Sequence, residues 1–231
     1  MLKAFGEGSR MLSSRTLAVN PARTIYLHSG KRVQGLKKNP EDVFKTHNGA
    51  VYGPSHENLQ YVKAFLQDKY SISDDLALQV LTHKSFGNGI KPYNEKLAAL
   101  GSKLVSLFFL KYATNQPTTN ETAINGKNMD CIGMPLTKSL SERAPMAFLA
   151  QQNNLNKVMF WKSYNHDLSF GRSGELKVSA QMVYALVGAV AFSHGKVVAE
   201  QFIQDRFVNA TPSLDGIASK LLEENIRSDK I

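Results

Sequence analysis

The sequence has little cysteine and no long apolar run. Cys131 is the only cysteine in 231 residues, which excludes an internal disulfide or a cysteine-rich zinc site and favours a reducing compartment. The histidines are scattered without an i,i+4 pair, which argues against bound zinc. The longest nearly unbroken apolar stretch, Met182 to Phe192, is about half as long as a membrane-spanning helix. We therefore expect no membrane span, no metal and no cofactor.

Acidic residues are nearly absent from the N-terminal part of the chain. Residues 1–40 contain eight Lys and Arg side chains against Glu7 alone, so they carry +7 of the formal net charge of +9. Residues 1–37 also lack the continuous hydrophobic block of a secretory signal, and this composition is typical of a mitochondrial presequence. The alternative is a basic arm that stays attached and contacts RNA phosphates. The remaining chain is near neutral, which is weak support for a large nucleic-acid surface.

Beyond residue 56 the sequence has helical periodicity and no alternating strand pattern. Residues 38–56 contain Pro, Gly and Asn, which is typical of a linker or an ordered strap. Ser73 is placed to cap a helix, and Gly195 is placed to end the long apolar helix that starts at Glu175. The expected helices lie at residues 57–70, 73–81, 94–111, 121–127, 145–152, 175–194, 196–208 and 212–225. The predicted fold class is all-α, with a helical domain at 57–210 and a C-terminal helical extension at 211–231.

Two segments of this helical region resemble the ribonuclease III endonuclease domain. Residues 81–112 follow the family's first motif, with matches at Leu81, Thr82, His83, Ser85, Asn94, Glu95, Leu97, Leu100 and Gly101. Residues 179–203 follow the second motif, with matches at Ala185, Leu186, Gly188, Ala189 and Gly195. The first motif is specific, whereas Ala/Gly-rich apolar helices like the second are common. The resemblance implies a ribonuclease III-type helical domain. We expect no double-stranded-RNA-binding domain, because only 20 residues follow Thr211.

The resemblance also implies where the family's chemistry would lie. Catalytic members hold Mg²⁺ with carboxylates four residues apart on the first-motif helix and three apart on the second, so that each pair shares one helix face. In this chain those positions are Ala98, Ser102, Gln181 and Tyr184. No Asp or Glu lies between Lys96 and Asn120 or between Leu176 and Ala199, so a small shift in alignment restores none. We therefore expect a protein that is not an enzyme.

The same resemblance places a dimer interface along the first-motif helix, where family members insert an aromatic side chain into the partner. This chain has Ala99 at that position, which removes the buried aromatic contact of a symmetric homodimer. Phe108 and Phe109 lie further along this helix and face either the core or a partner. A heterodimer with another ribonuclease III-like chain is attractive, because a larger partner side chain would fill the space opposite Ala99. Homodimer and monomer stay open.

Basic residues gather around the first motif, at Lys84, Lys91, Lys96 and Lys103. They are either contacts for RNA phosphates or solvated surface positions. A degenerate site with a mitochondrial-type N-terminus resembles the ribonuclease III-like proteins of the fungal mitochondrial large ribosomal subunit. That resemblance implies a structural role in the mitochondrial matrix, with ribosomal RNA and mitochondrial ribosomal proteins as partners. The alternative is a non-catalytic dimer partner of a nuclease in mitochondrial RNA processing.

Overall fold

The structure is a computed structural model that describes residues 26–27, 36–37, 43–121, 123–163, 165 and 167–228. The chain separates into two compact units, Met1–Pro40 and Glu41–Ile231. In the first unit the described residues form two short antiparallel strands, β1 (Tyr26–Leu27) and β2 (Leu36–Lys37). The rest of the predicted presequence or basic arm lies outside the described residues.

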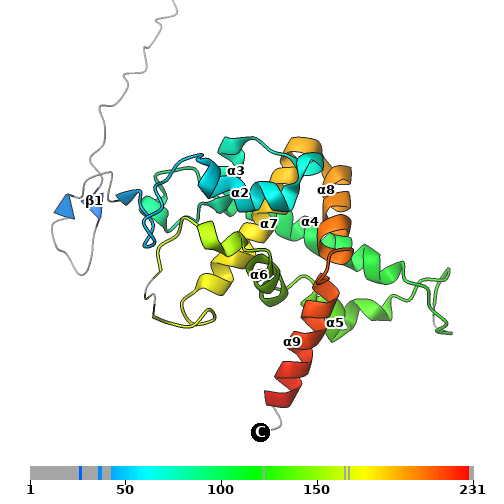
Figure 1. Cartoon of the computed structure of the whole chain (residues 1–231). Helices are drawn as coiled ribbons and strands as arrows, with labels where there is room; N and C mark the ends of the chain where they lie inside the picture. Colours follow the sequence, from blue (N-terminus) through cyan, green and yellow to red (C-terminus); the bar gives the residue numbers. More distant parts are fainter. Residues whose placement is uncertain are drawn as a thin grey trace, which may run out of the picture. The chain divides into compact units, whose positions relative to one another are not determined.

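Helix α7 (Glu175–His194) is the centre of the second unit. It contacts α3 (Asp74–Leu81), α4 (Glu95–Thr114), α6 (Arg143–Gln152) and α8 (Lys196–Ile203), and Figure 1 shows it running through the middle of these helices. From Val178 to Val190 every residue except Gln181 is buried. Burial of this continuous apolar surface is the dominant favourable contribution to folding of the unit.

Both α4 and α7 are long and apolar enough to span a membrane by length and composition alone, a test that core helices of globular proteins also pass. In α7, 67% of the apolar window is buried against the other helices, as expected for a core helix.

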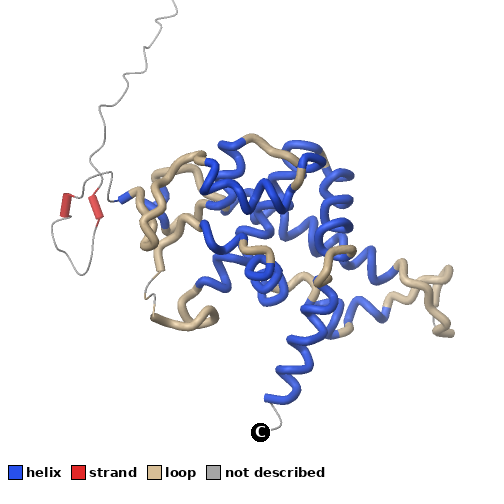
Figure 2. The backbone as a smooth tube through the Cα atoms, in the orientation of Figure 1, coloured by secondary structure: helices blue, strands red, loops and turns tan. Residues whose placement is uncertain are grey.

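The remaining elements cover this central group of helices. Helix α2 (His56–Leu66) packs on α3, while α9 (Leu214–Ser228) packs on α5 (Pro135–Ser139) and α6. Five single turns complete the unit: η1 (Asp68–Tyr70), η2 (Phe86–Gly89), η3 (Asp130–Gly133), η4 (Leu155–Val158) and the π-helical η5 (Gln204–Val208). Figure 2 shows that the connection after α4 projects from the helical body. The all-α prediction is confirmed for this unit.

Local sequence signals explain some helix boundaries but not all, since the helix predicted at 57–70 ends at Leu66, where Gln67 has a φ of 55°. The Ser73 hydroxyl accepts a hydrogen bond from the Leu76 amide, and α7 ends at Gly195, whose φ is 85°. The predicted helix at 121–127 is wrong, because Ile124 and Lys127 pair with each other across a tight turn. Asn125 and Gly126 have φ values of 52° and 74°, and this left-handed pair closes a two-residue turn that no helix can contain.

Residues 43–56, within the segment predicted as a linker or strap, lie against the helices. The Tyr52 ring packs on Phe86 and Phe160, with ring centroids 5.7 and 5.2 Å apart. The Asn58 side-chain amide donates to the carbonyls of Val51 and Gly53 at 2.9 Å. This segment is therefore a strap that is held at both the aromatic cluster and the start of α2.

Two glycines bring α4 and α7 into direct backbone contact. A Cβ atom at Gly101 would lie 1.8 Å from the Tyr184 carbonyl oxygen, and one at Gly188 would lie 2.0 Å from the Leu97 carbonyl oxygen. Both distances are far below van der Waals contact, so no larger residue fits without moving a helix. The crossing sets the spacing between the two helices that carry the family motifs.

This contact predicts that Gly101→Ala destabilises the protein by roughly 2 kcal/mol or more, because overpacking outweighs the better helix propensity of alanine. A chain of this length should lose roughly 4–8 °C in melting temperature, measured by circular dichroism. Gly133→Ala is the control, since nothing lies within 4 Å of its added Cβ. An unchanged or higher melting temperature for Gly101→Ala would contradict the proposed contact.

Candidate functional site

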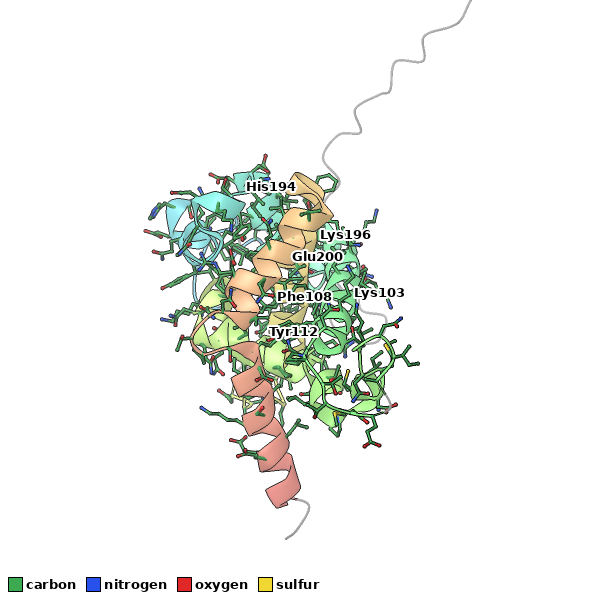
Figure 3. The ribbon with its side chains drawn as sticks, turned by 90° about the vertical axis from the view of Figure 1, so that its right-hand side faces the viewer. Lys103, Phe108, Tyr112, His194, Lys196 and Glu200 are labelled. Atoms are coloured by element: carbon green, nitrogen blue, oxygen red, sulfur yellow. The ribbon has the colours of Figure 1, made fainter. Side chains whose placement is uncertain are left out.

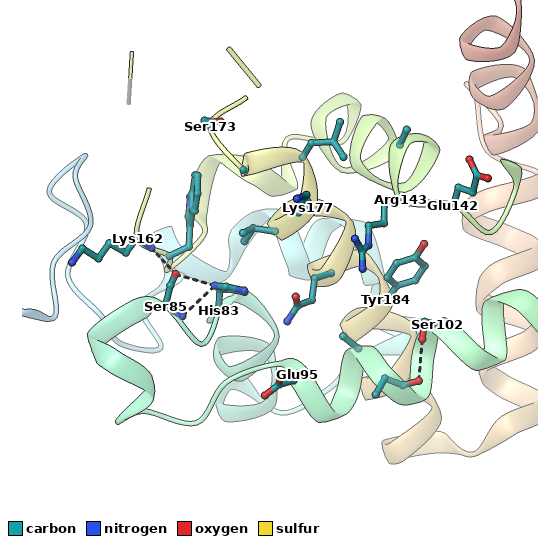
Figure 4. Close-up of a pocket in the computed structure, with 18 of the residues that line it drawn as sticks. His83, Ser85, Glu95, Ser102, Glu142, Arg143, Lys162, Ser173, Lys177 and Tyr184 are labelled. Carbon is teal, nitrogen blue, oxygen red and sulfur yellow. Dashed lines mark hydrogen bonds between the residues drawn. The ribbon is translucent and has the colours of Figure 1, made fainter. Parts of the chain in front are cut away.

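A cleft of about 1050 Å³ opens between α4, α6 and α7. Its lining includes all four positions that the ribonuclease III resemblance assigns to metal-binding carboxylates: Ala98, Ser102, Gln181 and Tyr184. The first two come from α4 and the other two from α7, so the glycine crossing is what brings the pairs together. Figure 4 shows the two helices and the side chains that line the space between them.

The side chain of Gln181 takes part in an internal hydrogen-bond network. Its side-chain amide donates to Asn94 Oδ1 at 2.9 Å, and Asn94 Nδ2 donates to the Val80 carbonyl at 2.8 Å. Asn94 is 1% exposed, and its backbone amide donates to the Thr82 carbonyl at 2.9 Å. Asn94 begins α4 as the sequence predicts, but its side chain links α3 to α7 and does not cap the helix.

Tyr184 joins α7 to the segment before α6. Its hydroxyl donates to the Ser141 carbonyl at 2.8 Å. Burial raises the pKa of this hydroxyl to about 12, although the positive charge of Arg143 lowers the pKa. Ser102 Oγ donates to the Ala99 carbonyl of its own helix at 3.0 Å. With Ala98, these residues offer only neutral groups where Mg²⁺ would require anionic oxygens.

Two acidic residues do line the cleft, away from those four positions. Glu95 forms an ion pair with Lys84 at 3.2 Å, and Glu142 precedes the first turn of α6. Throughout the part of the chain that the structure describes, no three His, Cys, Asp or Glu side chains form a group able to hold a metal ion.

His83 supports the cleft wall. Its Nδ1 lies 2.9 Å from Ser85 Oγ, and that hydroxyl also accepts from the Lys162 amide at 2.9 Å. Burial lowers the pKa of His83, which favours the neutral ring. These contacts agree with the first motif acting as scaffold in this chain.

Sequence reasoning missed the basic lining of the cleft. Arg143, Lys162 and Lys177 all contribute to its wall. Lys177 lies one helical turn before Gln181, so i,i+4 spacing on the second-motif helix was a usable signal. Arg143 and Lys162 lie outside both motifs, and no local pattern points to them.

The four predicted RNA-binding lysines have different surroundings. Lys84 pairs with Glu95, and Lys91 lies over the rings of Phe44 and Tyr52, at 4.7 and 5.5 Å from their centroids. Lys96 and Lys103 are exposed on α4, and their spacing of seven residues places them on one helix face. Among the described residues, Lys96 and Lys103 have no ion pair or cation–π contact of this kind.

The three candidate interface residues, Ala99, Phe108 and Phe109, differ in how far they are exposed. Ala99 is exposed on α4, whereas Phe109 is 2% exposed and belongs to the core, so it is not part of an interface surface. Phe108 is half-buried and stacks on Tyr112, with centroids 6.2 Å apart. Figure 3 shows Phe108 and Tyr112 between α4 and α8, with Lys103 pointing outward.

The chain belongs to the ribonuclease-III-like family, whose sequence profile matches residues 73–211. It is 25% identical over 149 residues to large ribosomal subunit protein mL57 of Neurospora crassa, covering 59% of this chain and 55% of that protein. It is 30% identical over 134 residues to ribonuclease 3 of Bdellovibrio bacteriovorus, covering 56% of this chain and 53% of that protein. The chain thus spans about half the length of the curated relatives it matches.

Among solved structures, the nuclease domain of ribonuclease III from Campylobacter jejuni is similar, with a TM-score of 0.47 and 21% identity. The likeness covers 66% of this chain and 99% of that domain.

The Tyr184 hydrogen bond predicts a measurable pH dependence. Tyr184→Phe should lower the free energy of unfolding by about 1 kcal/mol near neutral pH, because the Ser141 carbonyl loses its donor. A pKa raised to about 12 favours the protonated hydroxyl in the native state. The wild-type advantage should therefore persist up to the unfolded-state pKa of about 10 and decline as pH rises towards 12.

Urea unfolding of both proteins at stepped pH values measures this difference. An advantage that stays constant across the alkaline range would contradict the buried environment of Tyr184.

Proposed function

We propose that this protein is a non-catalytic, ribonuclease III-like component of the mitochondrial large ribosomal subunit. The observation that carries the proposal is the cleft itself, which brings together the four positions that the family resemblance assigns to metal-binding carboxylates, whereas Ala98, Ser102, Gln181 and Tyr184 supply none. Similarity to the ribosomal protein mL57 over 59% of the chain supports the ribosomal assignment. The mitochondrial matrix location follows from that relative together with the basic composition of residues 1–37.

Loss of catalysis follows from the chemistry of the cleft. Family members rely on metal ions to activate water and to stabilise charge on the leaving oxygen. Gln181 and Tyr184 already direct their polar atoms to Asn94 and Ser141. Hydrolysis of a phosphodiester at these four positions therefore has no metal-activated nucleophile.

The outer face of α4 is the surface that we assign to ribosomal partners. Leu100, Leu107 and Leu110 are 44, 41 and 36% exposed, and Lys96 and Lys103 lie on the same helix. The lysines are suited to RNA phosphates, and the leucines are suited to a protein neighbour. Ala99, which also lines the cleft, leaves room for a larger side chain of a second ribonuclease III-like subunit.

The absence of carboxylates at Ala98, Ser102, Gln181 and Tyr184 predicts that the purified full-length protein does not cleave duplex RNA in Mg²⁺ or Mn²⁺. We expect product formation no higher than that of Glu95→Ala, with a bacterial ribonuclease III as the positive control on a labelled duplex. Metal-dependent cleavage that Glu95→Ala abolishes would overturn the non-catalytic assignment.

The ribosomal assignment predicts where the protein sediments. Quantitative mass spectrometry across a sucrose gradient of gently lysed mitochondria should place it with the large ribosomal subunit, at about one copy per particle and resistant to moderate salt. A known large-subunit protein provides the stoichiometric reference. A peak confined to light fractions would contradict the assignment and would favour a dimer partner of a processing nuclease.

A further inference from the structure

The cleft carries more positive than negative charge. Arg143, Lys162 and Lys177 line it, and none has a carboxylate within 4.0 Å among the described residues. Of its two acids, Glu95 is already paired with Lys84. Figure 4 shows Arg143 beside Tyr184 and Lys177 nearby, whereas the side chain of Lys162 extends from beside Ser85 away from both. A site that binds metal cations in catalytic family members is thus suited to anionic groups in this chain.

Apolar side chains lie among these cations. Six of the lining residues are apolar: Ala98, Ala99, Ala144, Trp161, Leu176 and Val178. Trp161 and Leu176 are half-buried, so part of each remains accessible from the cleft. Apolar walls with a few fixed charged groups are typical of sites that hold a compact ligand with both apolar and polar parts.

We propose that this cleft binds a short segment of a partner protein that carries both acidic and apolar side chains. Carboxylates of the segment contact Arg143 and Lys177, and an apolar side chain packs against Trp161 and Leu176. The planar guanidinium of Arg143 can hold a carboxylate through two parallel hydrogen bonds. The inference rests on the proposed non-catalytic role, because neutral residues at the four metal-binding positions leave Glu95 and Glu142 as the only acids among the described lining residues, and Glu95 is paired with Lys84.

A protein segment suits the cleft better than an RNA duplex does. A duplex presents sugars and phosphates to a protein surface, and these leave apolar side chains without a partner. The exposed Lys96 and Lys103 on α4 offer phosphates a site outside the apolar walls. RNA in the cleft is therefore the competing outcome of the experiment.

The test uses the purified full-length protein and a display library of random peptides. Enriched sequences are synthesised and titrated while the fluorescence of Trp161 is recorded. Trp161 is the only tryptophan in the chain and lines both the cleft and a second pocket, so a shift in its emission that the cleft variants reduce reports binding at the cleft. We expect enriched peptides to combine acidic and apolar residues and to shift this emission, whereas a duplex RNA leaves it unchanged.

Charge reversal identifies the residues involved. Arg143→Glu and Lys177→Glu should each weaken peptide binding about tenfold or more, because a charge-assisted hydrogen bond is replaced by repulsion. Lys138→Glu is the matched control, since Lys138 is exposed and does not line the cleft, and it should stay within about threefold of wild type. Melting curves establish that all three variants fold.

Three results would overturn the proposal. They are no acidic enrichment among the selected peptides, peptide binding to the two cleft variants that is as tight as to wild type, or a duplex RNA that shifts Trp161 emission and binds the two cleft variants more weakly than wild type. The assay contains no ribosomes. A failed peptide assay therefore leaves the ribosomal assignment standing, and a failed sedimentation test leaves the cleft measurement intact.

Discussion

The backbone contact between α4 and α7 fixes the geometry on which the rest of the structure depends. Gly101 and Gly188 each place the opposite helix where a side chain would otherwise lie, so the interhelical distance is set by carbonyl groups and not by adjustable side chains. The cleft follows from this contact, because its walls continue from the two helices beyond the point of crossing. The helices therefore hold the shape of the cleft through their own packing.

Polar side chains that line the cleft form hydrogen bonds within the protein. Asn94 connects the end of α3 to Gln181 of α7, and Tyr184 connects α7 to Ser141. Each contact satisfies polar atoms that would be costly to leave unpaired in a partly buried wall. Exchange of carboxylates for neutral partners is thus compatible with the fold, whereas exchange of either crossing glycine is not.

The sequence predicted the helices well where local chemistry decides, as at the Ser73 cap and the Gly195 stop of α7. It failed at 121–127, because helical composition concealed an Asn-Gly pair that closes a turn with left-handed dihedrals. The family spacing also predicted which four residues meet in the cleft. Arg143, Lys162 and Trp161 reach it through the connections around α6 and before α7, and no periodicity specifies contacts across such distances in sequence.

Helix α4 contributes to two surfaces that differ in chemistry. Ala98 and Ser102 line the cleft, while Leu100, Leu107 and Leu110 are exposed to solvent. Because residues on different helix faces contact different neighbours, a ligand in the cleft does not have to displace a protein or an RNA that binds the outer leucines and lysines. On the same helix, Gly101 packs against the backbone of α7. One helix therefore serves as a packing surface, as a cleft wall and as a solvent-exposed surface, because its side chains point in different directions.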